Sequence, residues 1–157
     1  MKVEDVKKVG VLGAGVMGSG IAQVFATFGF DVIARSRSDA ALKRAMNEIM
    51  EGRYGLKKGV SRGKITQEQM DEAIKRIKMT TDMDEFCRDV DIVTECVLED
   101  LNLKMKVFAE LDRKCPKRTI LATTSSGLSI TALAGATKRP DKVIGTHWFN
   151  PPPVNPG

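Results

Sequence analysis

The sequence predicts an α/β fold, in which helices cover both faces of a mostly parallel, doubly wound sheet. Two observations carry this prediction. Short apolar runs that suit buried strands alternate along the chain with longer segments whose apolar residues recur at helical spacing. The first apolar run leads directly into a glycine-rich turn and a helical segment, an order that is typical of parallel sheets. A chain of 157 residues with 42% apolar content suits one core, so we expect a single domain over residues 1–157.

The first expected strand, residues 9–12, is followed by a turn of the pattern Gly-x-Gly-x-x-Gly. Its residues are Gly13, Ala14, Gly15, Val16, Met17 and Gly18. In such a turn the first glycine permits the tight bend, the second lets a pyrophosphate approach the backbone, and the third lets the next helix pack on the strand. That helix has apolar residues at helical spacing, and Gly29 is placed to end it. The apolar positions are Ile21, Val24, Phe25 and Phe28.

The second expected strand, residues 32–34, bears on the identity of the ligand. A carboxylate about 20 residues after the turn would bind the ribose hydroxyls of NAD. The chain instead has Arg35, Ser36 and Arg37 at this place. Without the carboxylate there is no repulsion of the 2′-phosphate of NADP, and a guanidinium group can bind that phosphate. We therefore expect NADP(H) as the cofactor, with NAD(H) as the alternative.

Two further helices follow in the first half of the chain. The first is expected to begin near Ser38 or Asp39, both good capping residues, and its apolar face should cover the sheet. The second begins after Thr66, which is spaced from Gln69 as in a capping box, and runs through Ile77. The apolar face of the first comprises Leu42, Ala45, Met46, Ile49 and Met50.

The glycine-rich and basic segment 57–64 between these helices indicates a turn. A last long helix has an apolar repeat at Leu103, Val107, Phe108 and Leu111, and proline stops it after Cys115. The proline-rich segment 151–157 cannot continue a helix or a central strand, so we expect the domain to end there. The remaining strands are expected at residues 79–81, 91–97, 119–122 and 143–149.

The composition argues against several classes of protein. Three cysteines without paired or metal-ligand spacing favour reduced thiols, a cytoplasmic location and no bound metal. The uncharged stretch 9–30 is long enough for a membrane helix, but the turn explains its six glycines better, so we expect no membrane span. The net charge of +5 is spread among acidic residues, which indicates solvated helix surfaces and no nucleic-acid partner; an anionic ligand with several phosphates is the sharper alternative.

Three more motifs accompany the glycine turn. They read Glu-Cys-Val-Leu-Glu at 95–99, Thr-Ser-Ser-Gly-Leu-Ser-Ile-Thr at 124–131, and His-Trp-Phe-Asn-Pro-Pro-Pro at 147–153. With them, nearly the whole chain resembles the L-3-hydroxyacyl-CoA dehydrogenase family. The resemblance implies a Rossmann-type cofactor-binding domain that lacks the family's helical C-terminal domain, which forms the dimer interface and closes the substrate cleft. It also implies a homodimeric parent enzyme that acts on an acyl-CoA such as acetoacetyl-CoA.

The resemblance further implies roles for individual residues. Residues 13–18 would bind the pyrophosphate, while Glu99, Lys104 and Asn150 would line the nicotinamide side. Ser126, beside the cofactor, would hydrogen-bond the reacting oxygen of the acyl group. His147 would be the general base that takes the hydroxyl proton, a role that suits an imidazole near neutral pH.

Each role has a simpler structural alternative. His147 ends an apolar strand and would serve there as a hydrogen-bonded structural residue, and Ser126 would satisfy the backbone of a turn. Glu99 and Lys104 would be exposed residues at the start of a helix. Lys57 and Lys58 lie where family members meet the phosphates of coenzyme A, although a solvated charge run explains them as well.

Two functional hypotheses follow from these residues. The first is a dehydrogenase domain that transfers hydride between a nicotinamide cofactor and C3 of a 3-hydroxyacyl-CoA or 3-ketoacyl-CoA. The second is a truncated or engineered nucleotide-binding module with little or no turnover. The second gains weight because hydride transfer requires both reactants to be held in near-attack geometry, and the substrate half of the family is missing.

Overall fold

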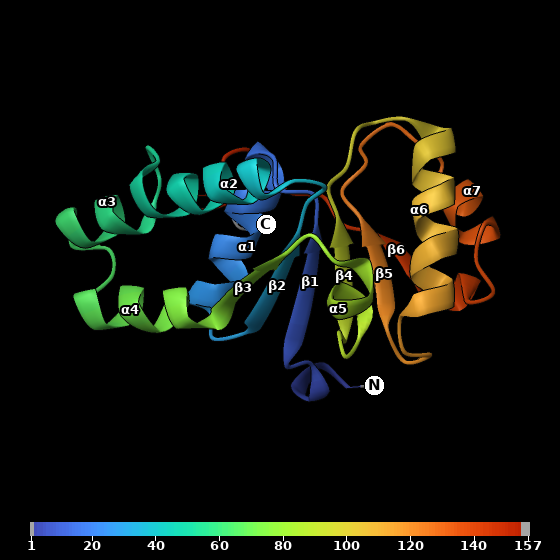
Figure 1. The fold of residues 1–157 in the computed structure, drawn as a ribbon, viewed down its shortest axis with the longest axis horizontal. Coiled ribbons are helices and arrows are strands. Elements are labelled where there is room, and N and C mark those ends of the chain that lie inside the picture. The colour runs from blue at the N-terminus through green and yellow to red at the C-terminus, as the bar shows by residue number, and fades with distance from the viewer. Residues whose placement is uncertain (1, 155–157) are drawn as a thin grey trace.

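The computed structural model describes residues 2–154, which form a six-stranded, fully parallel sheet with helices on both faces (Figure 1). The strand order is β3-β2-β1-β4-β5-β6, so the chain winds outwards from β1 in both directions. This order confirms the predicted doubly wound α/β fold. The strands are β1 (Lys8–Leu12), β2 (Asp31–Arg35), β3 (Ile77–Thr80), β4 (Ile92–Glu95), β5 (Ile120–Thr123) and β6 (Val143–Gly145).

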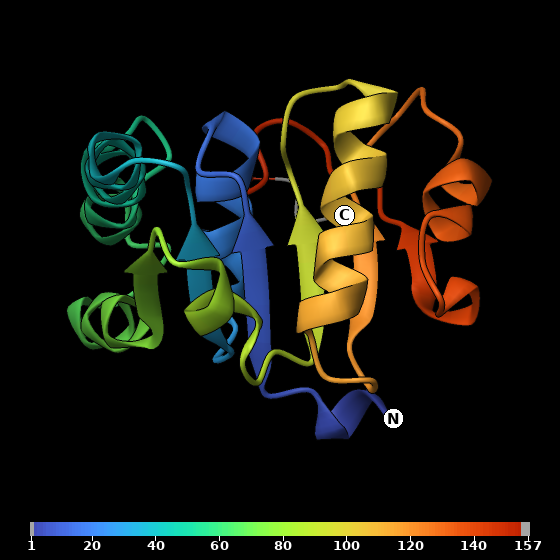
Figure 2. The ribbon, with the colours of Figure 1, turned by 45° about the vertical axis from the view of Figure 1, so that its right-hand side comes forward.

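The helices divide between the two faces of the sheet. In Figure 2, α5 and α6 lie in front of the sheet and α1 lies behind it, while α2, α3 and α4 form an arm beside β3. The helices are α1 (Val16–Thr27), α2 (Asp39–Glu51), α3 (Leu56–Ser61), α4 (Gln67–Arg76), α5 (Met83–Cys87), α6 (Leu101–Lys114) and α7 (Ile130–Gly135), with 3₁₀ turns at Val3–Asp5 and Pro140–Lys142.

The sheet separates two apolar cores, because successive side chains of a strand point to opposite faces. Val9 and Val11 of β1 belong to the core under α1, α2 and α4, whereas Leu12 belongs to the core under α5, α6 and α7. Gly10 brings the second core close to the backbone, because a β-carbon there would lie 2.8 Å from Cζ of Phe86. Both cores pack directly against the central strands, so the carboxyl ends of these strands form a rigid edge of the sheet, called the carboxyl edge below.

Local signals at the helix ends are confirmed. Ser38 caps α2 by accepting a hydrogen bond from the amide of Ala41 at 3.3 Å. Thr66 and Gln69 form the predicted capping box at α4, with N···O distances of 2.8 and 3.0 Å. Helix α6 ends at Lys114, with Cys115 as its C-cap. These features depend on residues at most three positions apart, which explains why the sequence predicts them.

Three predictions about elements are wrong, and two short helices were not foreseen. Ile77, expected to lie in a helix, instead begins β3, two residues before the strand predicted at 79–81. Segment 57–64, expected to be a turn, contains most of helix α3, because the buried Leu56 anchors the start of that helix. The short helices α5 and α7 have five and six residues, too few to show an apolar repeat in the sequence, and were not foreseen. The last strand ends at Gly145 instead of residue 149, because the chain turns away from the sheet after the amide of Thr146 bonds the Thr123 carbonyl at 2.9 Å.

The apolar repeats of two helices are only partly buried. Phe28, expected on the inner face of the first helix, is the C-cap residue of α1 and is 71% exposed. On α6, Leu103 is exposed and Lys104 is buried in its place. The inner face of α6 is therefore rotated relative to the predicted face.

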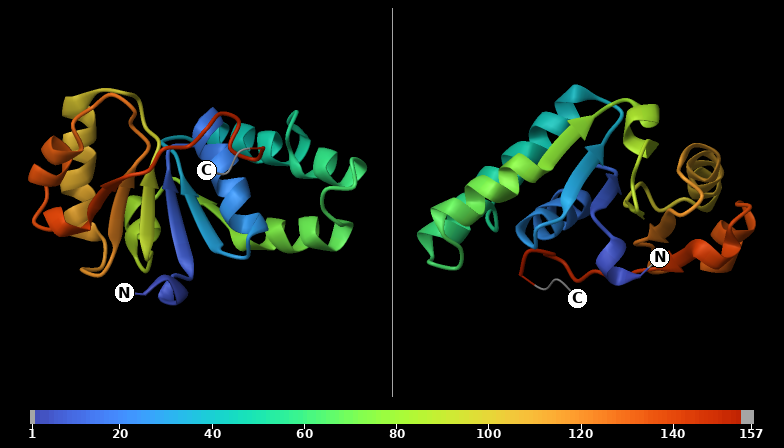
Figure 3. Two further views of the ribbon diagram at one scale, coloured as in Figure 1. Left: turned by 180° about the vertical axis from the view of Figure 1, so that it is seen from behind. Right: turned by 90° about the horizontal axis from the view of Figure 1, so that it is seen from below.

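The segment after β6 crosses back to α1 on the rear of the sheet (Figure 3). Trp148 packs edge-on against Phe25 of α1, with ring centroids 5.5 Å apart. Further along, Pro152 is buried and lies against Gly20, where a β-carbon would come within 3.1 Å of its ring. Residues 151–154 form neither helix nor strand, as expected, and residues 155–157 of the predicted tail lie outside the described residues.

Candidate functional site

The three glycines of the turn after β1 have the geometry that their pattern predicts. Gly13 has φ +109°, and a β-carbon there would lie 2.7 Å from the carbonyl oxygen of Cys96, so a larger residue does not fit. A β-carbon on Gly18 would lie 1.8 Å from the carbonyl oxygen of Gly13. A β-carbon on Gly15 would meet no atom within 4 Å. The first and third glycines therefore close the turn, while the second faces open space.

The start of α1 lacks a side-chain cap. Gly15 is the N-cap residue and forms no side-chain hydrogen bond, whereas Ser, Thr or Asp side chains cap α2, α4, α5, α6 and α7. The first backbone N–H groups of a helix have no partners within the helix, and its N-terminus carries a partial positive charge. Val16 here is 72% exposed. The turn therefore presents unpartnered N–H groups to any anion that enters, which suits a pyrophosphate.

A groove of about 310 Å³ runs from this turn along the end of β2 to α6. Arg35, Ser36 and Arg37 form one wall, and Arg35 is held by a hydrogen bond from Nε to the carbonyl of Thr81 at 3.3 Å. Glu110 is the only acidic residue among those that line the groove. The other lining residues are the turn residues Leu12, Gly13, Ala14 and Gly15 and the side chains of Met83, Cys96, Val97, Leu98, Leu103 and Val107.

The groove lies where the winding of the sheet reverses. β1 pairs with β2 on one side and with β4 on the other, and the chain leaves these strands in opposite directions. In open parallel sheets this is the place at which ligands bind. Arg35 ends β2, and Cys96 follows directly after β4. The structure thus brings the turn, the basic residues after β2 and the start of the 95–99 motif to one crevice.

The remaining predicted residues follow the next two strands at the same edge. Ser126 comes three residues after β5, and His147 comes two residues after β6, which pairs with β5. Ser126, His147 and Asn150 are all exposed. The His147 ring packs edge-on against Phe149 at a centroid distance of 5.1 Å.

The simpler alternatives for Ser126 and His147 are not found in the structure. Within residues 2–154, the ring of His147 forms no hydrogen bond, so it is not a hydrogen-bonded strand end. The turn after β5 is satisfied by Ser125, whose Oγ accepts a bond from the amide of Leu128 at 3.1 Å. The hydroxyl of Ser126 is thus left available for a ligand.

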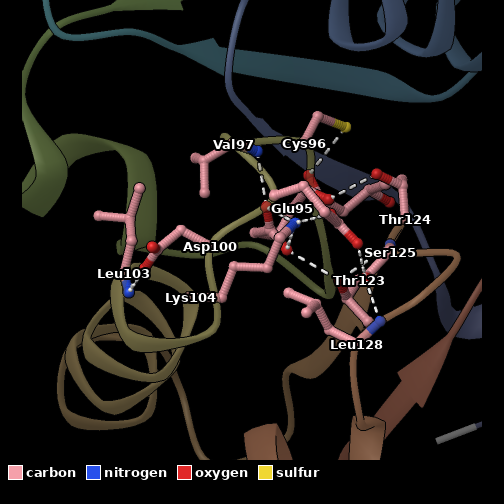
Figure 4. A network of polar contacts seen from close by, with 12 residues as sticks. Glu95, Cys96, Val97, Asp100, Leu103, Lys104, Thr123, Thr124, Ser125 and Leu128 are labelled. Carbon is pink, nitrogen blue, oxygen red and sulfur yellow. Dashed lines mark hydrogen bonds and ion pairs between the residues drawn. The ribbon is translucent and has the colours of Figure 1, made fainter.

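Beneath this edge lies a buried ion pair between Glu95, which ends β4, and Lys104 of α6 (Figure 4). The side chains are 0% and 1% exposed, and Lys104 Nζ lies 2.8 and 2.9 Å from the two carboxylate oxygens of Glu95. Glu95 also accepts bonds from the amide of Val97 at 2.6 Å and from the hydroxyl of Thr123 at 2.8 Å. The alternative that Lys104 is an exposed helix-start residue is therefore wrong. The same burial contradicts the expectation that the Lys104 side chain lines the nicotinamide side, because its ammonium is held by Glu95 beneath the edge.

Glu99 links this pair to the surface. One carboxylate oxygen lies 3.3 Å from Lys104 Nζ, and the other accepts a hydrogen bond from the hydroxyl of Ser125. The Ser125 hydroxyl, and next the Lys104 ammonium, lower the pKa of the Glu99 carboxyl. Glu99 remains half exposed, so its carboxylate is ionised at neutral pH beside the carboxyl edge.

Sequence reasoning missed the structural roles of Glu95, Thr123 and Ser125. The signal for Glu95 is a charged residue at the last position of an otherwise uncharged strand, where an unpaired carboxylate would be costly to bury. Its partner Lys104 is nine residues away on the next helix, a distance that no local pattern reveals. Ser125 and Ser126 are adjacent serines, and only the structure shows which of them serves the turn.

Lys57 and Lys58 are not near the groove. Both are exposed on α3, which Figure 1 shows in the arm that extends from the sheet beside β3. Lys57 pairs with Glu51 at the end of α2. The structure therefore places them apart from the residues at the carboxyl edge.

Other features of the described residues limit the chemistry of the site. Cys87, Cys96 and Cys115 are free thiols, as expected. Burial, and next the Glu95 carboxylate, raise the pKa of the Cys96 thiol to about 12, so this lining residue is protonated. Within residues 2–154, no three potential metal ligands of the His, Cys, Asp or Glu type come together. Nor does any helix in that range have the length and apolarity that a bilayer requires.

Comparisons with known proteins agree with this geometry. Residues 8–156 match the family model described as 3-hydroxyacyl-CoA dehydrogenase, NAD binding domain. A 3-hydroxybutyryl-CoA dehydrogenase from Clostridioides difficile is 43% identical over 147 residues, which cover 94% of this chain and 51% of that protein. The 3-hydroxyadipyl-CoA dehydrogenase of Escherichia coli K12 is 41% identical over 150 residues, 96% of this chain and 31% of that protein.

A solved structure is similar over the same range. The crystal structure of 3-hydroxybutyryl-CoA dehydrogenase from Escherichia coli K12 superposes with a TM-score of 0.89 and 41% identity, over 95% of this chain and 31% of that one. The chain thus spans about half, or less, of the length of these relatives.

Proposed function

The chain belongs to the 3-hydroxyacyl-CoA dehydrogenase family, as its NAD-binding domain, and from this premise we propose that it binds NADP(H) in preference to NAD(H). The observation that carries the proposal is the groove in which the open glycine turn and the Arg35-Ser36-Arg37 wall face one ligand site. The uncapped start of α1 fits a pyrophosphate, and the groove beyond it fits an adenosine.

The preference for NADP(H) rests on electrostatics at the end of β2. A carboxylate about 4 Å from a 2′-phosphate would be repelled by roughly 4 kcal/mol near a protein surface, and Ser36 carries no such charge. A guanidinium-phosphate contact by Arg37 or Arg35 would add roughly 1.5 to 3 kcal/mol. Each 1.4 kcal/mol corresponds to about tenfold in affinity, so we expect a preference of about ten- to a hundredfold.

The parent reaction assigns roles to the carboxyl edge. A bound nicotinamide supplies or accepts the hydride at C3 of the acyl-CoA. His147 takes the proton from the C3 hydroxyl during oxidation and returns it during reduction. Ser126 donates a hydrogen bond to the same oxygen and so holds it in reach of His147. Both side chains are exposed at the edge and free to make these contacts.

One observation favours a second candidate, a nucleotide-binding module with little or no turnover. Within residues 2–154, no carboxylate forms an ion pair with His147, whose ring packs edge-on against Phe149. A base that lacks an orienting partner is poorly positioned for proton transfer.

A titration of the chain with NADPH and with NADH tests the cofactor proposal. The fluorescence of the reduced nicotinamide reports binding, and we expect a lower Kd for NADPH. Equal affinities, or tighter binding of NADH, would contradict the role given to Ser36 and Arg37.

A second assay separates the two candidate functions. Acetoacetyl-CoA is added with saturating NADPH, and the absorbance of the nicotinamide is followed. Turnover at the rate of an intact dehydrogenase supports the enzyme. Cofactor binding without consumption of NADPH supports the binding module.

A further inference from the structure

We propose that the buried Glu95–Lys104 ion pair is a positioning device, which fixes the turn that carries Ser126 to the end of β4. The proposal rests on the proposed function only for the role of Ser126 in binding. The claim that the ion pair fixes the backbone of this turn does not depend on that role. Glu95 and Lys104 do not touch the exposed edge, so they act through other side chains.

The stability of the fold alone does not explain a buried ion pair between β4 and α6. Lys104 lies on the inner face of α6 together with the buried Phe108 and Leu111, where an apolar side chain would fill the core. Removing two charges from water costs free energy that their mutual attraction does not always return. A buried pair contributes most where its geometry fixes one arrangement of the elements that it joins.

The polar contacts around the pair form a closed ring that joins β4, β5 and α6 (Figure 4). Glu95 accepts from Thr123 at 2.8 Å, and the same Thr123 hydroxyl accepts from the amide of Ser125 at 3.1 Å. The Ser125 hydroxyl donates to Glu99, whose other oxygen lies 3.3 Å from Lys104 Nζ. Lys104 closes the ring on Glu95.

The ring holds the turn at two backbone amides on either side of Ser126. The amide of Ser125 bonds Thr123, and the amide of Leu128 bonds the oxygen of Ser125 at 3.1 Å. Ser126 lies between these anchors, and its own hydroxyl takes no part in the ring. The ring therefore fixes the backbone at Ser126 while leaving its side chain free for a ligand.

Hydrogen exchange at individual amides tests this claim. In Lys104→Met the ring is open at its buried side, and we expect the amides of Ser125 and Leu128 to exchange about tenfold faster relative to amides of β1. A lysine with no role beyond general stability would speed exchange in β1 by the same factor. The matched control is Lys106→Met, an exposed lysine on the same helix, which should leave both amides unchanged.

A second variant keeps the test decisive if Lys104→Met does not fold. Glu99→Gln opens the ring at its half-exposed side without creating a buried charge. Glu99 bonds the Ser125 hydroxyl, and a backbone hydrogen bond from Gly127 also lowers the pKa of its carboxyl, so this variant tests the hold of Glu99 on the whole turn. If neither variant changes Ser125 or Leu128 relative to β1, the positioning role is wrong.

A binding measurement separates this inference from the proposed function. We expect Thr123→Val, which opens the ring at a buried residue with no predicted cofactor contact, to weaken NADPH severalfold while leaving ADP-ribose, which lacks the nicotinamide, unchanged. If the unmodified chain binds neither ligand, the proposed function fails, and the exchange result still decides the role of the ring. If both ligands weaken equally, the ring supports the whole site and has no specific effect on the turn.

Discussion

At the scale of single residues, the proposed preference for NADP(H) rests on Ser36, which carries no charge where a carboxylate would repel a 2′-phosphate. Restoring the carboxylate in Ser36→Asp places a negative charge on the groove wall where a 2′-phosphate would lie. We expect NADPH to bind at least about tenfold more weakly and NADH to bind more tightly, because a carboxylate repels the phosphate and accepts bonds from ribose hydroxyls. Parallel titrations with both cofactors measure the change.

The matched control for this substitution is Ser61→Asp, on α3 and away from the groove, which adds the same charge to the molecule. It should leave the ratio of the two affinities unchanged. Equal shifts in Ser61→Asp and Ser36→Asp would mean that net charge, and not a local contact, sets the preference.

The glycine turn offers a second prediction, because two of its glycines differ in what surrounds them. Gly13→Ala places a methyl group 2.7 Å from the Cys96 carbonyl at a positive φ, so we expect a loss of about 1–3 kcal/mol in the free energy of unfolding. Gly15→Ala meets no neighbour, so the melting temperature should stay within a few degrees of the parent.

Gly15→Ala should leave stability nearly unchanged, but it should weaken cofactor binding. A methyl group on Gly15 occupies the space in which a pyrophosphate would approach the backbone, so cofactor affinity should fall by at least about tenfold in a folded protein. A Gly15→Ala variant that binds normally would show that the phosphates lie elsewhere.

At the scale of elements, Asp91 joins the starts of β1 and β4. Its carboxylate accepts bonds from the amides of Lys7 and Lys8 at 2.9 and 3.0 Å and from Arg118 Nε at 3.1 Å. Burial raises the pKa of Asp91, but the two amides and then the guanidinium lower it by more, so the net pKa is below its usual 3.8. Folding therefore favours the ionised form.

The pH dependence of stability follows from this sign. The contribution of Asp91 is fully present above its unfolded-state pKa of 3.8 and is lost as the pH falls through the lower pKa of the folded state. Asp91→Asn should cost about 1–3 kcal/mol near neutral pH, and the difference from the parent should shrink below pH 3.8. Denaturant titrations at several pH values measure it. Asp141→Asn, at an exposed residue away from β1 and β4, should cost much less at neutral pH; an equal loss there would contradict the assignment.

Some of the helices, strands and turns could be predicted from the sequence alone, and others could not. The doubly wound parallel fold, the glycine turn and the caps at Ser38 and Thr66 were predictable because each signal is local or repeats at a fixed period. Helix α3 was hidden, because Gly59 and the neighbouring lysines resemble a turn while its anchor Leu56 gains meaning only from burial. Motifs pointed to the candidate site residues, whose roles remain predictions. The ring through Glu95 was not foreseen, because it joins three elements that meet only in the folded sheet.

At the scale of the whole molecule, the segment after β6 ties the last strand to the first helix. Trp148, the single tryptophan, packs against Phe25. Pro152 lies so close to Gly20 that a β-carbon added there would be 3.1 Å from the proline ring. His147 and Asn150 lie on this segment, so its contact with α1 sets where both reach the carboxyl edge. His147 is thus positioned by contacts with a helix more than a hundred residues earlier in the chain.

A larger side chain on α1 should lift this segment. In Gly20→Val the added methyl groups press on Pro152, so we expect a loss of about 1–3 kcal/mol in unfolding free energy and a red shift of Trp148 emission as the indole becomes more exposed. The control is Gly135→Val in α7, where a β-carbon meets no atom within 4 Å and the emission should not move. An unshifted spectrum in Gly20→Val, with cofactor affinity also unchanged, would mean that the segment holds its place without α1, and that β6 alone positions His147.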